Sequence, residues 1–258
     1  MQKTLIRWHT RPALTEKTAL RDFMRALHPR MPGMELIRMG PRGDGGYLVP
    51  DDLGGVAACF SPGVAEESGF ELDCANAGMQ VFMADASVAK PAAAHGNFHF
   101  VRKNIGAFNA EECMTIDRWA EDSLPDSAAE LILQMDIEGG EYEVFLSMSE
   151  PLMKRFRIIA AEFHALHCLY HRPFFSIASR AFAKILQTHE CVHIHPNNVS
   201  RKKYTTDIPP LMEFTFLRRD RMRGEGKFAR NFPHSLDCDN VPARPPLPLP
   251  PCWRGAAD

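Results

Sequence analysis

Two short segments of the chain are almost continuously apolar, and they constrain its fold more than any other feature. LILQMD occupies residues 131–136, and IIAAEF occupies residues 158–163. Strands that are covered on both faces, as in parallel sheets flanked by helices, show this pattern. Stretches of helical character alternate with these and other strand candidates, which is typical of a doubly wound sheet. The sequence therefore predicts an α/β fold with a mostly parallel sheet.

Seven strands fit between residues 50 and 218 with connections of ordinary length. The predicted strands are 56–60, 80–85, 98–102, 131–136, 157–163, 191–195 and 211–217. The predicted helices among them include 69–77, 142–147 and 175–187. The sequence shows no internal repeat, so we expect one Rossmann-like, three-layer domain over residues 38–219.

Two extensions flank the predicted domain. Leu20, Phe23, Met24 and Leu27 have the spacing of an amphipathic helix that Pro29 ends, so residues 1–37 are predicted to be an N-terminal helical extension. At the other end, six of the ten residues in 242–251 are proline, and the stretch 218–230 before them is basic. Such a segment favours polyproline II over helix or sheet. We expect residues 220–258 to be a basic, then proline-rich tail, weakly ordered and outside the core; a P-x-x-P ligand for a partner domain is the alternative.

Composition excludes several classes of protein. The 30 Lys and Arg residues nearly balance 32 Asp and Glu residues, so no overall basic field indicates a nucleic-acid partner. Charges interrupt every apolar run before the roughly 18 to 20 residues that a membrane span requires, and the N-terminal segment lacks the apolar run of a signal peptide. The seven Cys residues form no C-x-x-C pair, which favours reduced thiols and a cytoplasmic location.

Ligands of open α/β sheets gather at the carboxyl ends of the strands, so the residues that end each predicted strand are the candidates for a site. The first strand ends at Ser61-Pro62-Gly63, where a glycine allows a ligand to approach the backbone closely. The second ends at Asp85, about 22 residues after Gly63, a spacing at which the two share a nucleoside in related sheets. A plain turn at Gly63 and a helix cap at Asp85 are the structural alternatives.

The fourth predicted strand is followed by the strongest local pattern in the sequence. Asp136, Glu138 and Glu141 surround a Gly-Gly pair within six residues. Carboxylates in such a place can bind a divalent cation, hold an amine or act as a general base. A polar helix N-terminus, where acidic side chains complement the dipole, is the alternative.

Later strands add polar groups at the same predicted edge. Glu162 lies inside an apolar run and therefore needs a partner or a shifted pKa. His164, with two further histidines at helical spacing, resembles no complete zinc signature, so we predict no zinc site. His195 and Asn197 end the sixth strand. Upstream, the stretch Gly43-Asp44-Gly45-Gly46 is either a turn or a segment that wraps a nucleoside from above.

In this order, these motifs resemble those of the FkbM-type S-adenosylmethionine-dependent methyltransferases. The resemblance spans residues 38 to 218 and is most specific in MDIEGGEYEVF, AEFH and HPNN. It implies a class I methyltransferase fold, whose seven-stranded sheet has an antiparallel last strand. It also implies S-adenosylmethionine as the cofactor and a hydroxyl group of a sugar, glycan or small natural product as the acceptor.

The resemblance also implies roles for individual residues. The cofactor side comprises Asp44, Gly45, Gly46, Ser61, Gly63, Glu66, Asp85 and Asp136. The acceptor side comprises Glu162, His164, His195 and Asn197, and the catalytic candidates are His164, Asp136 and Glu138. His164 or Asp136 would remove the acceptor proton; a divalent metal at the carboxylates is a less favoured variant.

Two other functions remain open from the sequence. An inactive methyltransferase-like binding module would act through the proline-rich tail. A nicotinamide-dependent oxidoreductase would need a full G-x-G-x-x-G after the first strand, and the chain has none there.

Overall fold

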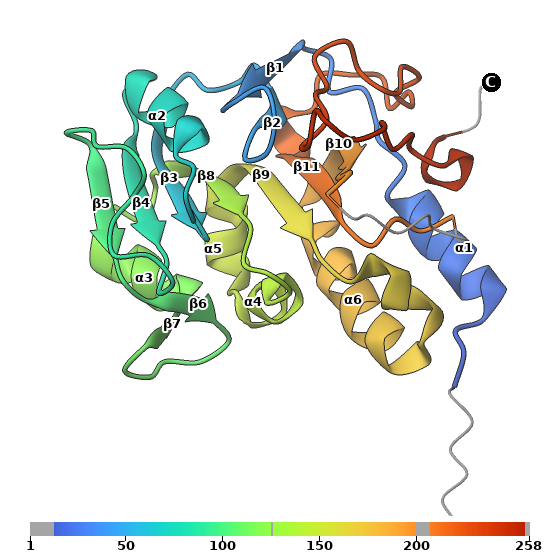
Figure 1. Ribbon diagram of the computed structural model, residues 1–258, viewed down its shortest axis with the longest axis horizontal. Helices are drawn as coiled ribbons and strands as arrows, with labels where there is room; N and C mark the ends of the chain where they lie inside the picture. Colours follow the sequence, from blue (N-terminus) through green and yellow to red (C-terminus); the bar gives the residue numbers. More distant parts are fainter. Residues whose placement is uncertain (1–12, 125, 200–206, 256–258) are drawn as a thin grey trace, which may run out of the picture.

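A seven-stranded sheet runs through the centre of the computed structural model, which describes residues 13–124, 126–199 and 207–255 (Figure 1). Its strand order is β10-β11-β9-β8-β3-β4-β5. All neighbouring strands are parallel except β11, which is antiparallel to both β9 and β10. The predicted fold class, a mostly parallel Rossmann-like sheet with an antiparallel last strand, is thereby confirmed.

The strands of this sheet lie within a few residues of their predicted positions. They are β3 (Val56–Pro62), β4 (Gln80–Ala84), β5 (Phe98–Val101), β8 (Glu130–Met135), β9 (Phe156–Phe163), β10 (His189–Pro196) and β11 (Met212–Arg218). Two small two-stranded sheets were not predicted: β1 (Leu36–Met39) pairs with β2 (Tyr47–Pro50), and β6 (Asn104–Gly106) pairs with β7 (Cys113–Thr115).

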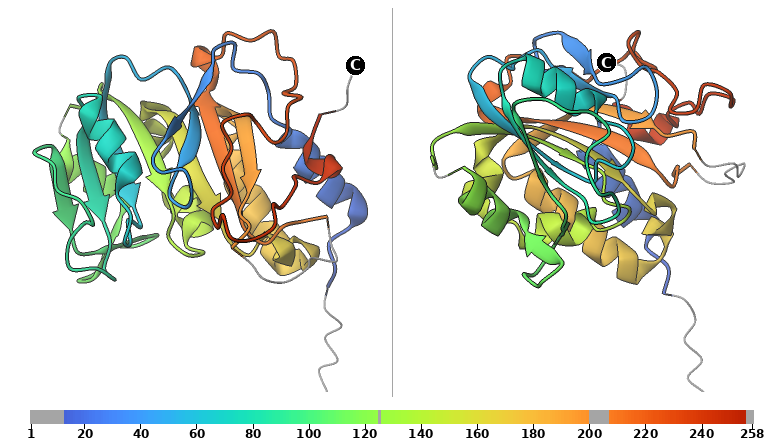
Figure 2. Two further views of the ribbon diagram at one scale, coloured as in Figure 1. Left: turned by 45° about the horizontal axis from the view of Figure 1, so that its top comes forward. Right: turned by 60° about the vertical axis from the view of Figure 1, so that its left-hand side comes forward.

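Both faces of the central sheet are covered, as the apolar strands require (Figures 1 and 2). One face carries α2 (Gly69–Asn76) and the β1–β2 hairpin. The other face carries the remaining helices: α1 (Lys17–Ala26), α3 (Ile116–Ser123), α4 (Glu141–Ser147), α5 (Glu150–Arg155) and α6 (Arg172–Ile185). Every residue of β9 is buried. Its alternate side chains enter the two opposite cores, Phe163 on the α6 side and Ala160 on the hairpin side.

The C-terminal tail is part of this core, so the expectation of a segment outside it is wrong for residues 220–255. Trp253 is completely buried, and its ring lies edge-on to Phe23 of α1 and Phe214 of β11. Leu249 is buried beside it. Proline prevents this segment from pairing its backbone in a sheet, but its Leu and Trp side chains still bury apolar surface, which the composition did not reveal. Residues 256–258, like residues 1–12 of the N-terminal extension, lie outside the described residues.

Among the helices of the described segments, none has the length and apolar character that crossing a bilayer requires.

Candidate functional site

A cavity of about 400 Å³ opens at the carboxyl ends of β3, β4 and β8. It has the size of an ordinary small-molecule site. Its lining combines glycines, two isoleucines and several polar side chains. The lining residues are Gly63, Ala65, Ala84, Asp85, Ser87, Lys103, Asn104, Ile105, Asp136, Ile137, Glu138, Gly140 and Glu143. Four residues singled out in the sequence, Gly63, Asp85, Asp136 and Glu138, therefore lie around one space.

Gly63 determines how closely the ends of β3 and β8 approach each other beside this cavity. Its backbone has φ of 83°, in the left-handed region that favours glycine, and its amide donates to the carbonyl of Ala84 (2.9 Å). The amide of Asp136 donates to the carbonyl of Pro62 (3.2 Å). A Cβ atom at position 63 would lie 1.6 Å from the carbonyl oxygen of Asp136. The missing side chain thus lets the ends of β3 and β8 touch, and this contact places Asp136.

Asp85 is a tethered anion at the end of β4. Its Oδ2 accepts a hydrogen bond from the amide of Ala65 (2.9 Å), and its Oδ1 accepts from the amide and the hydroxyl of Ser87 (2.7 and 2.6 Å). Burial acts to raise the pKa of Asp85, but these hydrogen bonds outweigh it and lower the pKa below its usual range. The Asp85 carboxylate is therefore held charged at the wall of the cavity, between the loop that follows β3 and the loop that follows β4.

Asp136 and Glu138, which line the cavity, meet His164, which lies behind them and does not line it. His164 Nε2 lies 3.2 Å from Glu138 Oε2 and 3.8 Å from Asp136 Oδ1. Burial raises the pKa of Asp136 to about 7; His164 opposes this shift, whereas Glu138 and Glu141 add to it. Burial lowers the pKa of His164, but the hydrogen bond to Glu141 and the charges of all three carboxylates give a net rise. The three catalytic candidates of the sequence therefore lie close together in space.

Glu141, at the start of α4, orients the imidazole of His164. Its side chain is fully buried, and its Oε1 accepts from the amides of Gly139 (3.0 Å) and Ile137 (3.3 Å). The same oxygen lies 3.1 Å from Nδ1 of His164. The imidazole therefore presents Nδ1 to Glu141 and Nε2 to the two other acids. The sequence counted Glu141 among three clustered carboxylates but gave no sign of this positioning role.

Two predicted acceptor residues, Glu162 and Asn197, lie in a neighbouring buried polar cluster. Asn197 Nδ2 donates to Glu162 Oε1 (2.8 Å), and both residues are almost fully buried. Burial raises the pKa of Glu162 well above its usual range, and the charges of Asp136 and Glu213 add to the rise. Glu213, which the sequence did not indicate, lies opposite Glu162 on β11.

The C-terminal tail contributes Asn240 to this polar cluster. Asn240 Nδ2 donates to Glu213 Oε1 (2.7 Å) and to Asp44 Oδ1 (3.0 Å). Asp44 is thereby joined to the predicted acceptor side, in the turn of the β1–β2 hairpin. The adjoining Gly45 and Gly46 pack against Glu67 and Arg38, and neither lines the cavity.

Two other predicted cofactor residues also lie apart from the cavity. Ser61 is fully buried, and its hydroxyl contacts the carboxylate of Glu71 and Gln134 Oε1 (2.6 Å) beneath the α2 side of the sheet. Glu66 is exposed and does not line the cavity. Strand alternation and loop direction decide these placements, and neither could be read from the motif alone.

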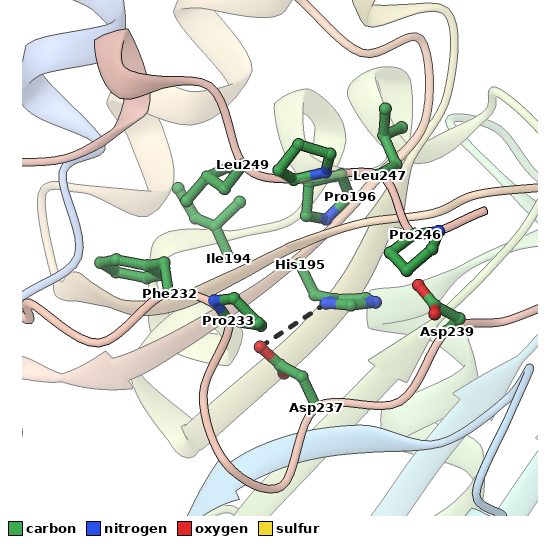
Figure 3. A pocket seen from close by; sticks show the side chains of 11 residues that line it. Ile194, His195, Pro196, Phe232, Pro233, Asp237, Asp239, Pro246, Leu247 and Leu249 are labelled. Atoms are coloured by element: carbon green, nitrogen blue, oxygen red, sulfur yellow. Dashed lines mark ion pairs between the residues drawn. The ribbon is translucent and has the colours of Figure 1, made fainter.

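His195 lies in a separate, smaller pocket of about 210 Å³ between β10 and the tail (Figure 3). Its Nδ1 lies 3.6 Å from Asp237 Oδ2, and apolar side chains such as Phe232 and Leu249 surround it. Burial acts to raise the pKa of Asp237, but hydrogen bonds from His193 and His195 outweigh it and lower the pKa. In the described part of the chain, only Asp136, Glu138 and His164 gather with the spacing of metal ligands, so the other histidines form no such group.

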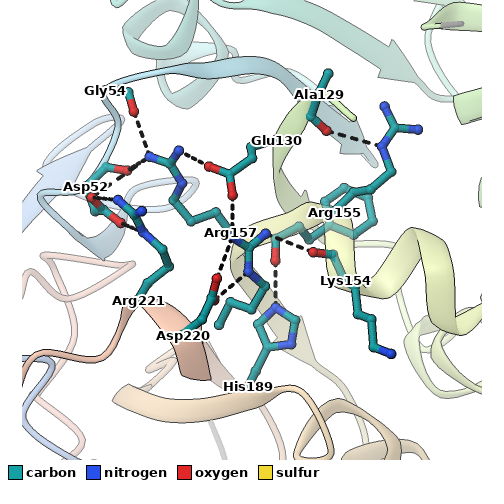
Figure 4. A network of polar contacts seen from close by, with 12 residues as sticks. Asp52, Gly54, Ala129, Glu130, Lys154, Arg155, Arg157, His189, Asp220 and Arg221 are labelled. Atoms are coloured by element: carbon teal, nitrogen blue, oxygen red, sulfur yellow. Dashed lines mark hydrogen bonds and ion pairs between the residues drawn. The ribbon is translucent and has the colours of Figure 1, made fainter. Parts of the chain in front are cut away.

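A second polar network, around Arg157, lies at the opposite edge of the sheet (Figure 4). Arg157 is buried, donates to the carbonyls of Asp52 (2.7 Å) and Gly54 (2.8 Å), and contacts the carboxylate of Glu130. Arg221 pairs with Asp52 through two bonds of 2.6 Å. This edge holds the amino ends of β8 and β9, so the network stabilises the fold at a distance from the cavity.

Comparisons with known proteins give one family match. Residues 71–194 match the family model described as the methyltransferase FkbM domain. No curated protein matches the chain. Among solved structures, a match is the crystal structure of a single-residue mutant of the 16S rRNA (adenine(1408)-N(1))-methyltransferase from Catenulisporales acidiphilia, with 10% identity over 70% of this chain and 97% of that chain, and a TM-score of 0.30. A TM-score of this size says nothing about the acceptor of the present chain.

Proposed function

We propose, from the match of residues 71–194 to the model of the methyltransferase FkbM domain, that the chain is an S-adenosylmethionine-dependent O-methyltransferase. The observation that carries the proposal is the meeting of Gly63, Asp85 and Asp136 around one cavity at the carboxyl ends of three parallel strands. This edge is where open α/β sheets bind nucleotides and related cofactors. The acceptor we propose is a hydroxyl group of a sugar, a glycan or a small natural product.

The cavity fits the parts of the cofactor. Asp85 is a charged, anchored carboxylate, and its oxygens would accept hydrogen bonds from the two ribose hydroxyls. Ile105 and Ile137 supply apolar wall for the adenine. Gly63 leaves the backbone open for the methionine part, and the carboxylates of Asp136 and Glu138 favour a positively charged sulfur nearby.

When bound, the cofactor supplies a methyl group on a sulfonium, which is reactive enough to need no covalent catalysis by the protein. The chain has to place the acceptor oxygen in line, exclude water and take up the hydroxyl proton. His164 and Asp136 would take up that proton, and Glu141 holds the imidazole in place. Glu162 and Asn197, joined by their hydrogen bond, offer polar groups for the remainder of the acceptor.

The proposal is tested by incubating the chain with methyl-labelled S-adenosylmethionine and a panel of sugars, glycans and small polyols. We expect a methyl ether on one member of the panel. His164→Gln should slow transfer while cofactor binding, measured by calorimetry, persists. Asp136→Asn should slow transfer and also weaken cofactor binding, because Asp136 lines the cavity; Glu121→Gln, on the exposed side of α3, is the matched control. A residue whose replacement leaves turnover unchanged is removed from the base role, and methylation of amines alone would contradict the O-methyltransferase assignment.

A further inference from the structure

We propose that Asp136, Glu138 and His164 bind a divalent cation at the wall of the cofactor cavity. Each residue offers one ligand atom, a carboxylate oxygen or a ring nitrogen, and the three atoms all lie within 4.8 Å of one another. Two ligands at right angles on a cation, each at about 2.1 Å, are separated by about 3 Å. The observed separations of 3.2 and 3.8 Å from His164 Nε2 need only a small contraction to reach that value.

The orientation of His164 is the one that a metal-ligating histidine requires. Such a histidine donates its second ring nitrogen to a carboxylate or carbonyl, which fixes the tautomer and directs the lone pair to the metal. Here Nδ1 lies 3.1 Å from Glu141 Oε1, and the Glu141 side chain is fully buried. Two backbone amides hold that oxygen in turn. Nε2 thereby faces Asp136 and Glu138, where it can ligate a cation once its proton has left.

A second observation, independent of the spacing, is an oxygen without a partner. Asp136 Oδ1 is inaccessible to solvent, although the side chain as a whole is 28% exposed, and this oxygen forms no hydrogen bond among the described residues. It is the same atom that faces His164 Nε2, and the 3.8 Å between them is too long for a hydrogen bond. A buried carboxylate oxygen without a partner is costly, and a cation between the two atoms would satisfy it.

The excess negative charge of the cluster also favours a bound cation. Three carboxylates, of Asp136, Glu138 and Glu141, surround one imidazole, and their ion pairs within the described segments are all with His164. The Glu138 side chain is 87% exposed, yet its carboxylate stays 3.2 Å from His164. Its backbone has φ of 57°, a conformation that costs energy in a residue other than glycine. A divalent cation would compensate the excess negative charge.

The donor set indicates which cations fit. Two carboxylates and one imidazole, without thiolates, suit Mn²⁺ and Mg²⁺ and differ from the four-ligand sets of structural zinc. Three ligands leave open positions on an octahedral cation, and Asp136 and Glu138 both line the cavity. The open positions would therefore face the space in which cofactor and acceptor meet.

The role of the cation, unlike its binding, rests on the proposed function. A hydroxyl bound to the cation loses its proton more readily. That proton would pass to the second carboxylate oxygen of Asp136. The hydroxyl oxygen then forms its bond to the methyl carbon, and the electron pair of the broken sulfur–carbon bond stays on sulfur. The cation would thus share the activation of the acceptor with His164 and Asp136.

The test is a titration of the chelator-treated full chain with Mn²⁺, in which the electron paramagnetic resonance signal measures the free ion. We expect one site per chain, from which Mg²⁺ displaces Mn²⁺. Glu138→Gln, at an exposed position, and His164→Gln should weaken binding at least tenfold, and Glu141→Gln should do so through the orientation of His164, by roughly 10- to 100-fold. Glu121→Gln should bind Mn²⁺ as the unaltered chain does. Circular dichroism of each variant establishes that it is folded.

Two results would overturn the inference: no stoichiometric Mn²⁺ binding up to about millimolar concentration, or equal losses in Glu138→Gln and Glu121→Gln. Calorimetry of S-adenosylmethionine with the metal-free chain separates this inference from the proposed function. Cofactor binding without Mn²⁺ binding removes the cation site alone. Mn²⁺ binding without cofactor binding removes the cofactor assignment alone.

Discussion

Replacing Gly63 by alanine is the sharpest perturbation of the contact that builds the cavity. The new Cβ would lie 1.6 Å from the carbonyl oxygen of Asp136, and the backbone at position 63 has φ of 83°. The clash would displace Asp136, which lines the cofactor cavity and is also a catalytic candidate, and the positive φ would strain the backbone at position 63. The variant should therefore be less stable and also impaired in cofactor binding.

The size of the effect follows from its two parts. A side chain in the left-handed region costs about 1 to 2 kcal/mol. Overpacking against atoms that cannot move freely costs about 1 to 3 kcal/mol more. The Gly78→Ala variant isolates the first part, because Gly78 has φ of 92° and an added Cβ there would meet no atom within 4 Å. Gly63→Ala should thus lose about 1 to 3 kcal/mol more stability than Gly78→Ala.

Urea unfolding of the two variants and the unaltered chain measures this difference. Calorimetry with S-adenosylmethionine measures the second consequence, a loss of about tenfold or more in affinity for Gly63→Ala, equal to one well-placed hydrogen bond. Gly78→Ala should bind the cofactor normally. If Gly63→Ala is no less stable than Gly78→Ala and binds the cofactor normally, Gly63 does not place Asp136 and the reasoning fails.

Three further predictions concern the tail, the buried acid of α2 and the network at the far edge of the sheet. Trp253→Ala should cost about 3 to 5 kcal/mol in urea unfolding because it empties a fully buried site; a loss below about 1 kcal/mol would show that the tail is not part of the core. Burial raises the pKa of Glu71 from 4.5 to about 7, so its favourable contribution is complete below pH 4.5 and is lost as the pH rises to about 7. Between pH 5.5 and 8 the unaltered chain should therefore lose about 2 kcal/mol relative to Glu71→Gln, and parallel pH profiles of the two proteins would contradict this. Arg157→Leu should cost about 3 kcal/mol because it leaves the carbonyls of Asp52 and Gly54 without their donor and removes one of the two arginine partners of Glu130, whereas Lys154→Ala, at an exposed ion pair, should cost less than about 1 kcal/mol; equal losses would refute the role given to the network.

The sequence was sufficient to predict the sheet, because strands buried on both faces are apolar along most of their length. β8 and β9 are the clearest cases. The β1–β2 hairpin was not predicted, because its two strands have only four residues each and flank a glycine-rich loop that includes Gly45 and Gly46. Such short strands show too little alternation of apolar and polar residues to be recognised. The tail was misjudged because proline content reports on backbone pairing and not on the burial of Trp253.

The site was predicted in part for similar reasons. Gly63, Asp85 and Asp136 end successive parallel strands, so topology alone brings them to one edge. The orientation of His164 depends on Glu141 from another element, and the bond from Asn240 to Asp44 joins residues 196 positions apart. Contacts of this kind arise from tertiary packing, and no local pattern encodes them.

The central claim is that the cavity at Gly63, Asp85 and Asp136 binds S-adenosylmethionine, and calorimetric titration with Asp85→Ala tests it most directly. The unaltered chain should bind S-adenosylmethionine and S-adenosylhomocysteine but not NAD. Asp85→Ala should weaken binding of both sulfur compounds by about 1 to 3 kcal/mol, the worth of hydrogen bonds to a charged group. Binding of NAD instead, no binding of either sulfur compound near millimolar concentration, or an unchanged affinity in Asp85→Ala would contradict the claim.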